Sequence, residues 1–381
     1  MVDAPQAIEA GQNPGLPPPR TEVGVLGWIK HNLLSTPFNA VMTVLAIWFL
    51  WSILPPLFEW ILLDSVWTAE SRKECWAKME VSGGHGTAAC WAFIANRIEL
   101  FVYGFYPAPL RWRVNLSFVL LIMAIVPVLY DKMPGRKFGL LYAVAFPFIT
   151  GWLLVGGFGL APVDTDQFGG ILLTLIIGVT GITFSLPIGV LLALGRRSKM
   201  PVLRVMCVLF IEFIRGVPLI ALLFIASTML NYFLPPGTVF DLLIRVLIMV
   251  TLFAAGYIAE VVRGGLQAIP IGQYEAAESL GLTYVKAHWL IVLPQALKIS
   301  IPGIVNTFIG LYKDTTLVLI IGMLDPLGVG RASLADAVWA GLAREVYLFV
   351  AMFFFICCFS MSRYSLYLER KLDTGHVDQG G

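Results

Sequence analysis

The chain has 381 residues, of which 58% are hydrophobic and only 13% are charged, and its mean hydropathy is +0.81. Soluble domains carry about 25% charged residues, so this composition excludes a protein whose surface lies mainly in water and indicates one that lies mainly in lipid. The net charge of +2 gives no support to nucleic-acid binding. The five cysteines and four histidines lack the spacing of a metal site, so neither nucleic acid nor metal is expected as a ligand.

The N-terminal segment 1–37 is polar and rich in proline and glycine, which predicts a disordered cytoplasmic tail. It does not read as a signal peptide, because the first apolar run starts too deep in the chain and no small-residue cleavage site follows it. A bilayer crossing needs about 20 apolar residues. Runs of this kind lie near 38–57, 112–130, 138–160, 169–195, 203–231, 240–262, 299–323 and 346–368. The sequence therefore predicts an all-α membrane protein with about eight transmembrane helices.

Basic residues alternate between the connecting loops, as expected when positively charged loops remain in the cytoplasm. The loops at 161–168 and 232–239 contain no Lys or Arg. The basic residues are Lys132, Arg136 and Lys137 after the second span, Arg196, Arg197, Lys199 and Arg204 after the fourth, and Arg363, Arg370 and Lys371 beside the last. With eight spans, this pattern places both termini in the cytoplasm and the long loop 58–111 in the periplasm. There Cys75 and Cys90 could form a disulfide or remain two thiols, and the sequence leaves both open.

The chain changes character near residue 165. The spans before this point are rich in Trp and Phe and carry no motif, whereas motifs are dense from about residue 169 onward. We therefore expect an N-terminal three-span extension over 38–165, which includes the loop 58–111, and a five-helix core over 166–372. A short cytoplasmic tail, 373–381, follows.

The longest internal cytoplasmic loop, 263–298, predicts two short helices. Residues 274–280 favour a helix that Gly281 ends, because glycine adopts the left-handed conformation without steric cost. A second helix is expected over 283–291, with Thr283 as a possible N-cap and Pro294 barring a straightforward continuation. Two short helices at an angle would form a projection that a partner protein can hold.

Small side chains suit the first of these helices to docking. Ala276 and Ala277 would let its backbone enter a partner's groove, and Glu275 is expected in the first turn, where a carboxylate favours the helix dipole. The residues Glu275, Ala276, Ala277, Gly281, Ile291, Leu293 and Pro294 stand at the spacing of the EAA loop of ABC importer permeases, which this segment resembles. The resemblance implies that they couple this chain to an ATPase subunit. The alternative is an ordinary amphipathic loop helix whose Glu, Ala and Gly only satisfy propensity and capping.

Three flanking stretches, 211–219, 257–270 and 313–317, resemble the polar amino-acid branch of these permeases. The resemblance covers about residues 169–368, and the additional N-terminal spans look like those of the enlarged permeases of general L-amino-acid uptake systems. It implies a type I ABC importer-like five-helix core in a bacterial inner membrane. The implied partners are a dimer of ATPase subunits that binds ATP and Mg²⁺, a second permease subunit, identical or related, and a periplasmic amino-acid-binding protein. No cofactor is expected in this chain itself.

Two Glu–Arg pairs have a spacing of three residues, which places both members on one helix face. They are Glu212 with Arg215, and Glu260 with Arg263. Each pair is expected to neutralise itself as a structural ion pair. After the first pair, Gly216 and Pro218 allow a bend in the fifth span.

Lys313 and Asp314 lie inside the seventh span and are followed by Thr315. Ionisable residues within a span cost about 2.5–3.5 kcal/mol each even on the translocon scale, so these two must be compensated. One interpretation is an internal or interhelical ion pair that fixes packing. The other places Lys313, Asp314 and Thr315 beside a water-filled translocation pathway, where a zwitterionic substrate would match both charges.

The chain contains no Gly-x-x-x-x-Gly-Lys-Ser/Thr loop, so it cannot hydrolyse ATP by the usual route, and it carries no hydrolase motif. We predict a non-catalytic transport subunit that works by alternating access. Small residues in the fourth span, Thr174, Gly178, Gly181 and Ser185, would permit close helix contact and sliding, or simple packing. One alternative is an ion-gradient-driven secondary amino-acid transporter, for which several buried carboxylates are expected and only Asp314 qualifies. Another is a membrane scaffold that uses 263–298 to hold a different partner. Substrate identity and the composition of the pore stay open.

Overall fold

The structure, a computed structural model, describes residues 24–81, 88–130, 132–229, 232, 235 and 240–372. The chain forms two compact units, the first comprising Met1–Val66 and Trp76–Ala89 and the second comprising Trp67–Cys75 and Cys90–Gly381. The described residues form helices joined by loops and include no β-strand, which confirms the expected all-α class. The helices are α1 (Gly24–Asn32), α2 (Pro37–Phe58), α3 (Arg72–Val81), α4 (Ala92–Tyr103), α5 (Arg111–Leu129), α6 (Arg136–Val155), α7 (Gly170–Arg196), α8 (Pro201–Gly216), α9 (Leu219–Phe224), α10 (Leu242–Gln267), α11 (Ile271–Ser279), α12 (Tyr284–Ala287), α13 (Leu293–Asp314), α14 (Pro326–Ser333) and α15 (Ala343–Leu372). Shorter 3-10 or π-helical segments are η1 (Glu59–Leu63), η2 (Ala108–Leu110), η3 (Thr165–Gln167), η4 (Ile225–Met229), η6 (His288–Val292) and η7 (Thr315–Ile321).

Seven helical stretches in the described residues are long and apolar enough to cross a membrane. They are Pro37–Leu63, Ala108–Leu129, Arg136–Val155, Gly170–Arg196, Leu242–Gln267, Tyr284–Ile321 and Ala343–Leu372. An eighth span is present if the bent pair Pro201–Gly216 and Leu219–Met229 crosses as one. These stretches follow the eight predicted runs, with clear differences in the fifth and the seventh.

The fifth span is broken where α8 meets α9 at 103°. Val217 has an extended backbone, with φ −107 and ψ 131, because the residue before a proline is disfavoured in the helical region. Pro218 then stands as the N-cap of α9. The bend that the sequence allows at Gly216 and Pro218 is therefore present, and it is sharp.

The seventh span begins at Tyr284, not near residue 299, because α12, η6, α13 and η7 form one helical run. The expectation that Pro294 bars continuation is wrong. Pro294 occupies the first turn of α13, where a missing N–H is tolerated, and the π-helical turn η6 joins that turn to α12. Thr283 is the N-cap residue of α12, as predicted, but its side chain makes no capping hydrogen bond.

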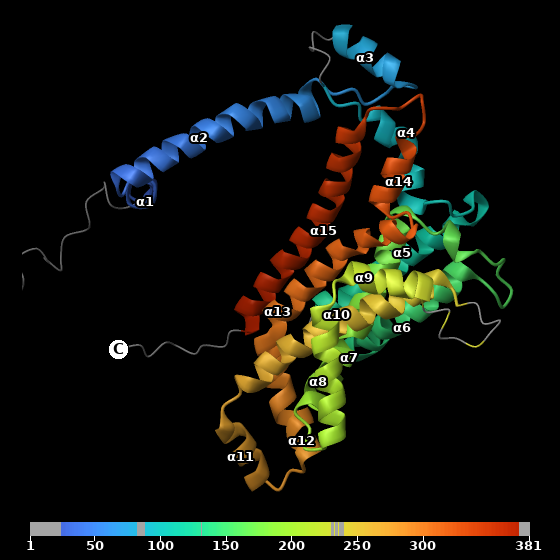
Figure 1. Cartoon of the computed structure of the whole chain (residues 1–381). Coiled ribbons are helices and arrows are strands. Elements are labelled where there is room, and N and C mark those ends of the chain that lie inside the picture. The colour runs from blue at the N-terminus through green and yellow to red at the C-terminus, as the bar shows by residue number, and fades with distance from the viewer. Residues whose placement is uncertain are drawn as a thin grey trace, which may run out of the picture. The chain divides into compact units, whose positions relative to one another are not determined.

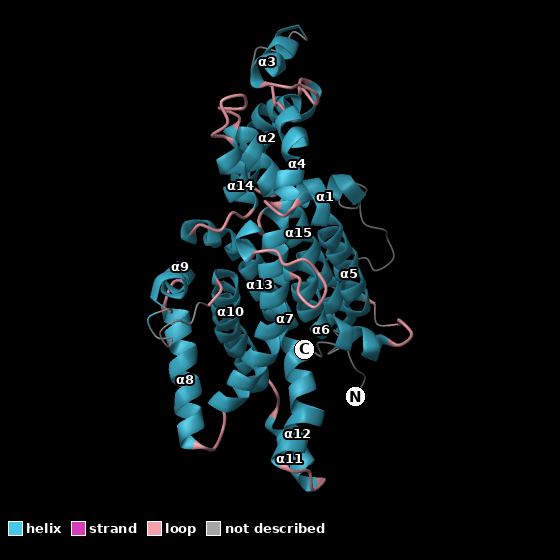
Figure 2. Cartoon of the chain, turned by 90° about the vertical axis from the view of Figure 1, so that its right-hand side faces the viewer, coloured by secondary structure: helices cyan, strands magenta, loops and turns pink. Residues whose placement is uncertain are grey.

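The second unit is built around α7 and α10, which pack along each other, while α13 packs on α10 and α15 packs on α13 (Figure 2). One apolar core contains Leu173, Ile177 and Val246, and another contains Ile258 and Val292. In Figure 1, α11 and α12 lie at one end of this unit, whereas α4 and α14 lie at the other. We call these the α11 end and the α4 end.

Small residues bring α7 close to its neighbours, as the sequence predicts. A Cβ atom on Gly178 would lie 2.8 Å from the ring of Tyr312, and one on Gly189 would lie 2.6 Å from the side chain of Ile258. Thr174, Gly178, Gly181 and Ser185 are all buried. Contacts this short require glycine at Gly178 and Gly189, because any larger side chain would push α13 or α10 away.

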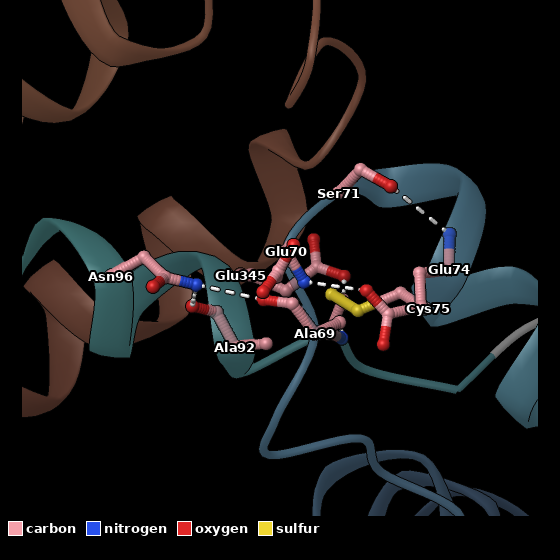
Figure 3. Close-up of a disulfide and its surroundings, with 9 residues drawn as sticks. Ala69, Glu70, Ser71, Glu74, Cys75, Ala92, Asn96 and Glu345 are labelled. Carbon is pink, nitrogen blue, oxygen red and sulfur yellow. Dashed lines mark hydrogen bonds between the residues drawn. A yellow bond between two sulfur atoms is a disulfide. The ribbon is translucent and has the colours of Figure 1, made fainter.

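A disulfide links Cys75 to Cys90 at the α4 end, with a Cα–Cα distance of 6.1 Å (Figure 3). Of the two alternatives that the sequence leaves open, the structure has the disulfide. The Cys90 N–H donates a hydrogen bond to the buried carboxylate of Glu345 at the start of α15 (3.2 Å). The Asn96 side chain in α4 donates to the Ala69 carbonyl at 2.8 Å. These contacts hold the segment 67–75 against α4 and α15.

The structure bears differently on the two predicted terminal tails and on the predicted domain boundary near residue 165. Residues 1–23 and 373–381 lie outside the described residues. The prediction of a disordered tail over 1–37 is wrong for α1 (Gly24–Asn32), in which Val25, Trp28 and Ile29 recur at helical spacing. The boundary near residue 165 stays a prediction, and the second unit includes α4 to α6 together with α7 to α15.

Candidate functional site

The loop at the α11 end has the turn that the sequence predicts. Helix α11 ends at Ser279, and Gly281 follows with φ +70. The Gly281 N–H donates to the Glu278 carbonyl at 2.8 Å, and the Leu282 N–H donates to the Ala277 carbonyl at 3.2 Å, which closes the helix. A Cβ atom on Gly281 would meet nothing within 4 Å. The backbone conformation, and not lack of space, therefore requires glycine here.

The seven EAA-loop residues divide into two groups by exposure. Glu275, Ala276, Gly281 and Pro294 are exposed, whereas Ala277 and Leu293 are buried and Ile291 is half-buried. The first group is available to a partner. The second group packs the loop onto its own bundle.

Two geometric expectations for this helix are wrong. Glu275 is not in the first turn, because α11 begins at Ile271, immediately after its N-cap Pro270. Ala277 does not face outward, because it has no exposed surface. Pro270 fixes its own φ near the helical value, so the helix starts earlier than its polar residues suggest.

Large apolar side chains are exposed around α11. Leu280 is 75% exposed and Ile271 is 74% exposed, and Val285 in α12 is also exposed. We define the coupling surface as Ile271, Glu275, Ala276, Leu280 and Val285. The sequence does not identify Ile271, Leu280 or Val285 as site residues, because isolated apolar residues in a loop resemble core positions. What identifies them as site residues is the exposure of their side chains, which only the structure provides.

A groove of about 740 Å³ lies beside the coupling surface. Polar side chains from three elements line it, namely Gln273 of α11, Gln295 and Lys298 of α13, and Glu369 of α15. Gln295 donates a hydrogen bond to Gln273 at 3.2 Å. Within the described residues, no cluster of His, Cys, Asp or Glu could hold a metal ion.

An ion-pair network joins the last turns of α7 and α8 to α10. Arg196 lies 2.9 Å from Glu212 and 3.3 Å from Glu260, and Glu260 also pairs with Arg263 in its own helix. Arg215 lies 3.8 Å from Glu260. The predicted pair within α10 is confirmed. In α8, the predicted Glu212–Arg215 pair is replaced by contacts to other helices, because Arg196 of α7 lies against Glu212 and Glu260 of α10 lies near Arg215.

The candidate pathway residues lie where α13 changes to the 3-10 helix η7. Lys313 is exposed, Asp314 is half-buried, and Thr315 is 1% exposed, with its hydroxyl donating to the Tyr312 carbonyl at 2.8 Å. In the part of the chain that the structure describes, neither Lys313 nor Asp314 forms an ion pair. Pro294 and Lys313 belong to the same helical run, and at 1.5 Å per residue they are about 28 Å apart. One continuous helical run therefore connects the coupling loop to the candidate pathway.

Known proteins are similar to this chain over nearly its whole length. A family profile described as "Binding-protein-dependent transport system inner membrane component" matches residues 185–374. The inner membrane amino-acid ABC transporter permease protein YhdY of Escherichia coli (strain K12) is 48% identical over 352 residues, which cover 92% of this chain and 94% of that protein. The chain belongs to this family of ABC importer permeases. These similarities confirm the predicted resemblance to ABC importer permeases. They give no support to the alternative of a secondary transporter driven by an ion gradient.

A second relative of similar length, from another bacterium, agrees with this assignment. The glutamate/glutamine/aspartate/asparagine transport system permease protein BztC of Rhodobacter capsulatus is 46% identical, with 94% of this chain and 96% of that protein covered. Among solved structures, an amino acid ABC transporter crystallised with histidines is 28% identical, with a TM-score of 0.47 and coverage of 53% of this chain and 92% of that one. The family profile and the two relatives of similar length show that the chain is a multi-pass subunit of an importer in the bacterial inner membrane, and that its family works with a binding protein.

Proposed function

We propose that this permease carries polar L-amino acids across the inner membrane by alternating access, driven by ATP hydrolysis in a separate subunit. The two relatives of similar length are named for amino-acid transport, one of them for glutamate, glutamine, aspartate and asparagine. The observation that carries the energy-coupling half of the proposal is the coupling surface, which projects from the bundle in register with the EAA motif.

The coupling surface is suited to hold an ATPase subunit. Of the nine residues in α11, only Ala277 is buried, so most of this helix faces away from its own chain. Leu280 and Ile271 expose apolar area next to the carboxylate of Glu275. Burying one such side chain in a partner's groove contributes about 1.5–3 kcal/mol. We assign docking to Glu275, Ala276 and Gly281, packing of the loop to Ala277, Ile291 and Leu293, and the first turn of α13 behind the loop to the exposed Pro294.

Lys313, Asp314 and Thr315 are the proposed pathway residues. An exposed ammonium inside a span costs about 2.5–3.5 kcal/mol if it faces lipid, and no carboxylate in the described residues pairs with Lys313. A water-filled pathway between this subunit and a second permease would solvate Lys313. The ammonium and carboxylate of a bound amino acid would then find opposite charges on Asp314 and Lys313.

The proposed assembly follows from this assignment. The α11 end lies in the cytoplasm with both termini, where two ATPase subunits bind ATP and Mg²⁺, and the α4 end lies in the periplasm, where the binding protein delivers substrate. A second permease, identical or related, completes the pore. The basic residues Arg196 and Arg197 at the α11 end of α7 support this orientation.

The test is amino-acid uptake into liposomes that contain the permease, its ATPase and its binding protein. Gly281→Val places a β-branched residue at φ +70, which is strained by at least about 1–2 kcal/mol, whereas Gly281→Asn places a residue that tolerates this conformation. We expect ATP-dependent uptake by the wild type, a loss of about tenfold or more in Gly281→Val, and near-wild-type uptake in Gly281→Asn. Uptake that does not depend on ATP would refute the proposal and favour an ion-driven transporter.

A further inference from the structure

Two adjacent arginines at the end of α7 contact different parts of the protein. Arg196, the last residue of α7, joins the ion-pair network with Glu212 and Glu260. Arg197, the C-cap, contacts the loop that carries the coupling surface. The end of α7 is therefore a junction between the bundle and α11.

Arg197 completes a closed set of contacts among three elements. Its Nη1 donates to the Leu266 carbonyl in the last turn of α10 at 2.9 Å and to the Tyr274 hydroxyl of α11 at 3.3 Å. The Tyr274 hydroxyl itself donates to the Leu266 carbonyl at 3.2 Å, and the guanidinium lies 5.8 Å from the centre of the Tyr274 ring. We call Arg197, the Leu266 carbonyl and Tyr274 the Arg197 bracket. A cation at the carbonyl end of α10 also favours the dipole of that helix.

The elements on either side of the bracket are packed tightly. A Cβ atom on Gly195 would lie 2.5 Å from the Cys207 sulfur, so the end of α7 is in direct contact with α8. The Tyr274 ring meets the ring of His288 at 5.8 Å between centres, and His288 is buried at the start of the seventh span. Because Tyr274 contacts Arg197, the Leu266 carbonyl and His288, a movement of Tyr274 acts on α7, α10 and the seventh span together.

Helix α11 has few other contacts with the bundle. It follows α10 after the three residues Ala268 to Pro270, it buries only Ala277, and Gln273 accepts a hydrogen bond from Gln295 of α13, not from α7 or α10. Apolar burial of one methyl group gives weak orientation. The directional contacts of the bracket are therefore the ones that fix the angle of α11 against α7 and α10.

We propose that Arg197 is a positioning residue for energy coupling, which fixes α11 so that movement of the docked ATPase is delivered to α7 and α10. The inference rests on the proposed function. It adds that docking and transmission are separable, because Arg197 lies outside the coupling surface. Without the bracket, α11 still holds the ATPase but swivels about its connection to α10.

The experiment measures ATP hydrolysis and amino-acid uptake on the same reconstituted liposomes and takes their ratio. Arg197→Gln removes the charge-assisted hydrogen bonds, so we expect the ATP consumed per amino acid to rise about tenfold, with hydrolysis within about twofold of the wild type. Tyr274→Phe keeps the ring against His288 and removes only the hydroxyl, so we expect a rise of about threefold. Arg197→Lys keeps a donor for the Leu266 carbonyl and should restore part of the coupling. Arg204→Gln, which removes an exposed arginine at the start of α8, is the matched control and should leave the ratio unchanged.

Two results would overturn the inference. In one, both hydrolysis and uptake by Arg197→Gln stay at the wild-type level. In the other, hydrolysis and uptake fall in proportion, which indicates lost assembly and not lost transmission. Failure of the proposed function has a different signature, namely uptake without ATP in the wild type or a Gly281→Val variant that transports normally. If Gly281→Val is inactive and Arg197→Gln is fully coupled, only the bracket is refuted.

Discussion

Asp325 is a carboxylate without exposed surface at the N-terminus of α14. Its Oδ1 accepts a hydrogen bond from the Gly328 N–H at 2.8 Å, whereas its Oδ2 has no hydrogen-bond partner in the described part of the chain. Burial disfavours the ionised form, and it raises the pKa of Asp325 from 3.8 to about 6. This group therefore makes stability depend on pH.

The direction and size of the effect follow from linkage. The pKa of Asp325 is higher in the folded than in the unfolded protein. Its contribution to the stability of the folded protein is therefore complete below about pH 3.8 and is lost as the pH rises through about 6. The difference between these two pKa values corresponds to about 3 kcal/mol in all. About 2 kcal/mol of it falls between about pH 4.5 and about pH 7.5. Asp325→Asn keeps an acceptor for Gly328 and cannot ionise, so it should remove this component.

Thermal unfolding of the detergent-purified protein at several pH values measures the effect. With an unfolding entropy of about 2.1 cal/mol/K per residue over 381 residues, the loss of about 2 kcal/mol lowers Tm by about 2–3 °C. When the pH rises from about 4.5 to about 7.5, we expect the Tm of the wild type to fall by about 2–3 °C more than the Tm of Asp325→Asn. Asp164→Asn removes an exposed carboxylate and should keep the wild-type dependence. Identical pH dependence in the wild type and Asp325→Asn would refute the reasoning.

Three further predictions concern the disulfide, helix packing and the pathway. Cys75→Ser should lower the free energy of unfolding by about 3 kcal/mol under non-reducing conditions, because the disulfide closes a segment with a sequence separation of 15. The double variant that also carries Cys90→Ser should lose the same amount. Losses that add up in the double variant would contradict this prediction. Gly265→Ala should cost about 1–3 kcal/mol in thermal unfolding, because its Cβ would lie 2.1 Å from the Ser300 hydroxyl and 2.5 Å from the Ala296 carbonyl. Gly264→Ala, whose Cβ meets nothing within 4 Å, should be neutral, so equal effects at the two glycines would be inconsistent with close packing. Lys313→Met should lower uptake about tenfold or more without loss of ATP hydrolysis, and unchanged uptake would remove Lys313 from the pathway.

Features set by local chemistry could be predicted from the sequence. Apolar runs locate the spans because lipid exposure demands them, and Gly281 marks the helix end because other residues rarely adopt positive φ. The bend at Pro218 follows from the restriction that proline places on the preceding residue. Each of these depends on a few consecutive residues.

Features set by three-dimensional neighbours could not be predicted in this way. The partners of Glu212 and Arg215 depend on where α7 and α10 end, so a rule based on spacing within one helix selects the wrong pair. The exposure of Leu280 depends on what its helix packs against. Continuation through Pro294 depends on a π-helical turn, which hydrophobic periodicity does not reveal.

The most direct test of the account is photo-crosslinking from position 280 in the assembled importer. A photoreactive amino acid at Leu280 lies on the coupling surface, and one at Tyr347, which is exposed in α15 near the α4 end, provides the control. We expect an adduct with the ATPase subunit from position 280 and none from position 347. Absence of an ATPase adduct from position 280, or equal adducts from both positions, would contradict the claim that α11 couples this permease to ATP hydrolysis.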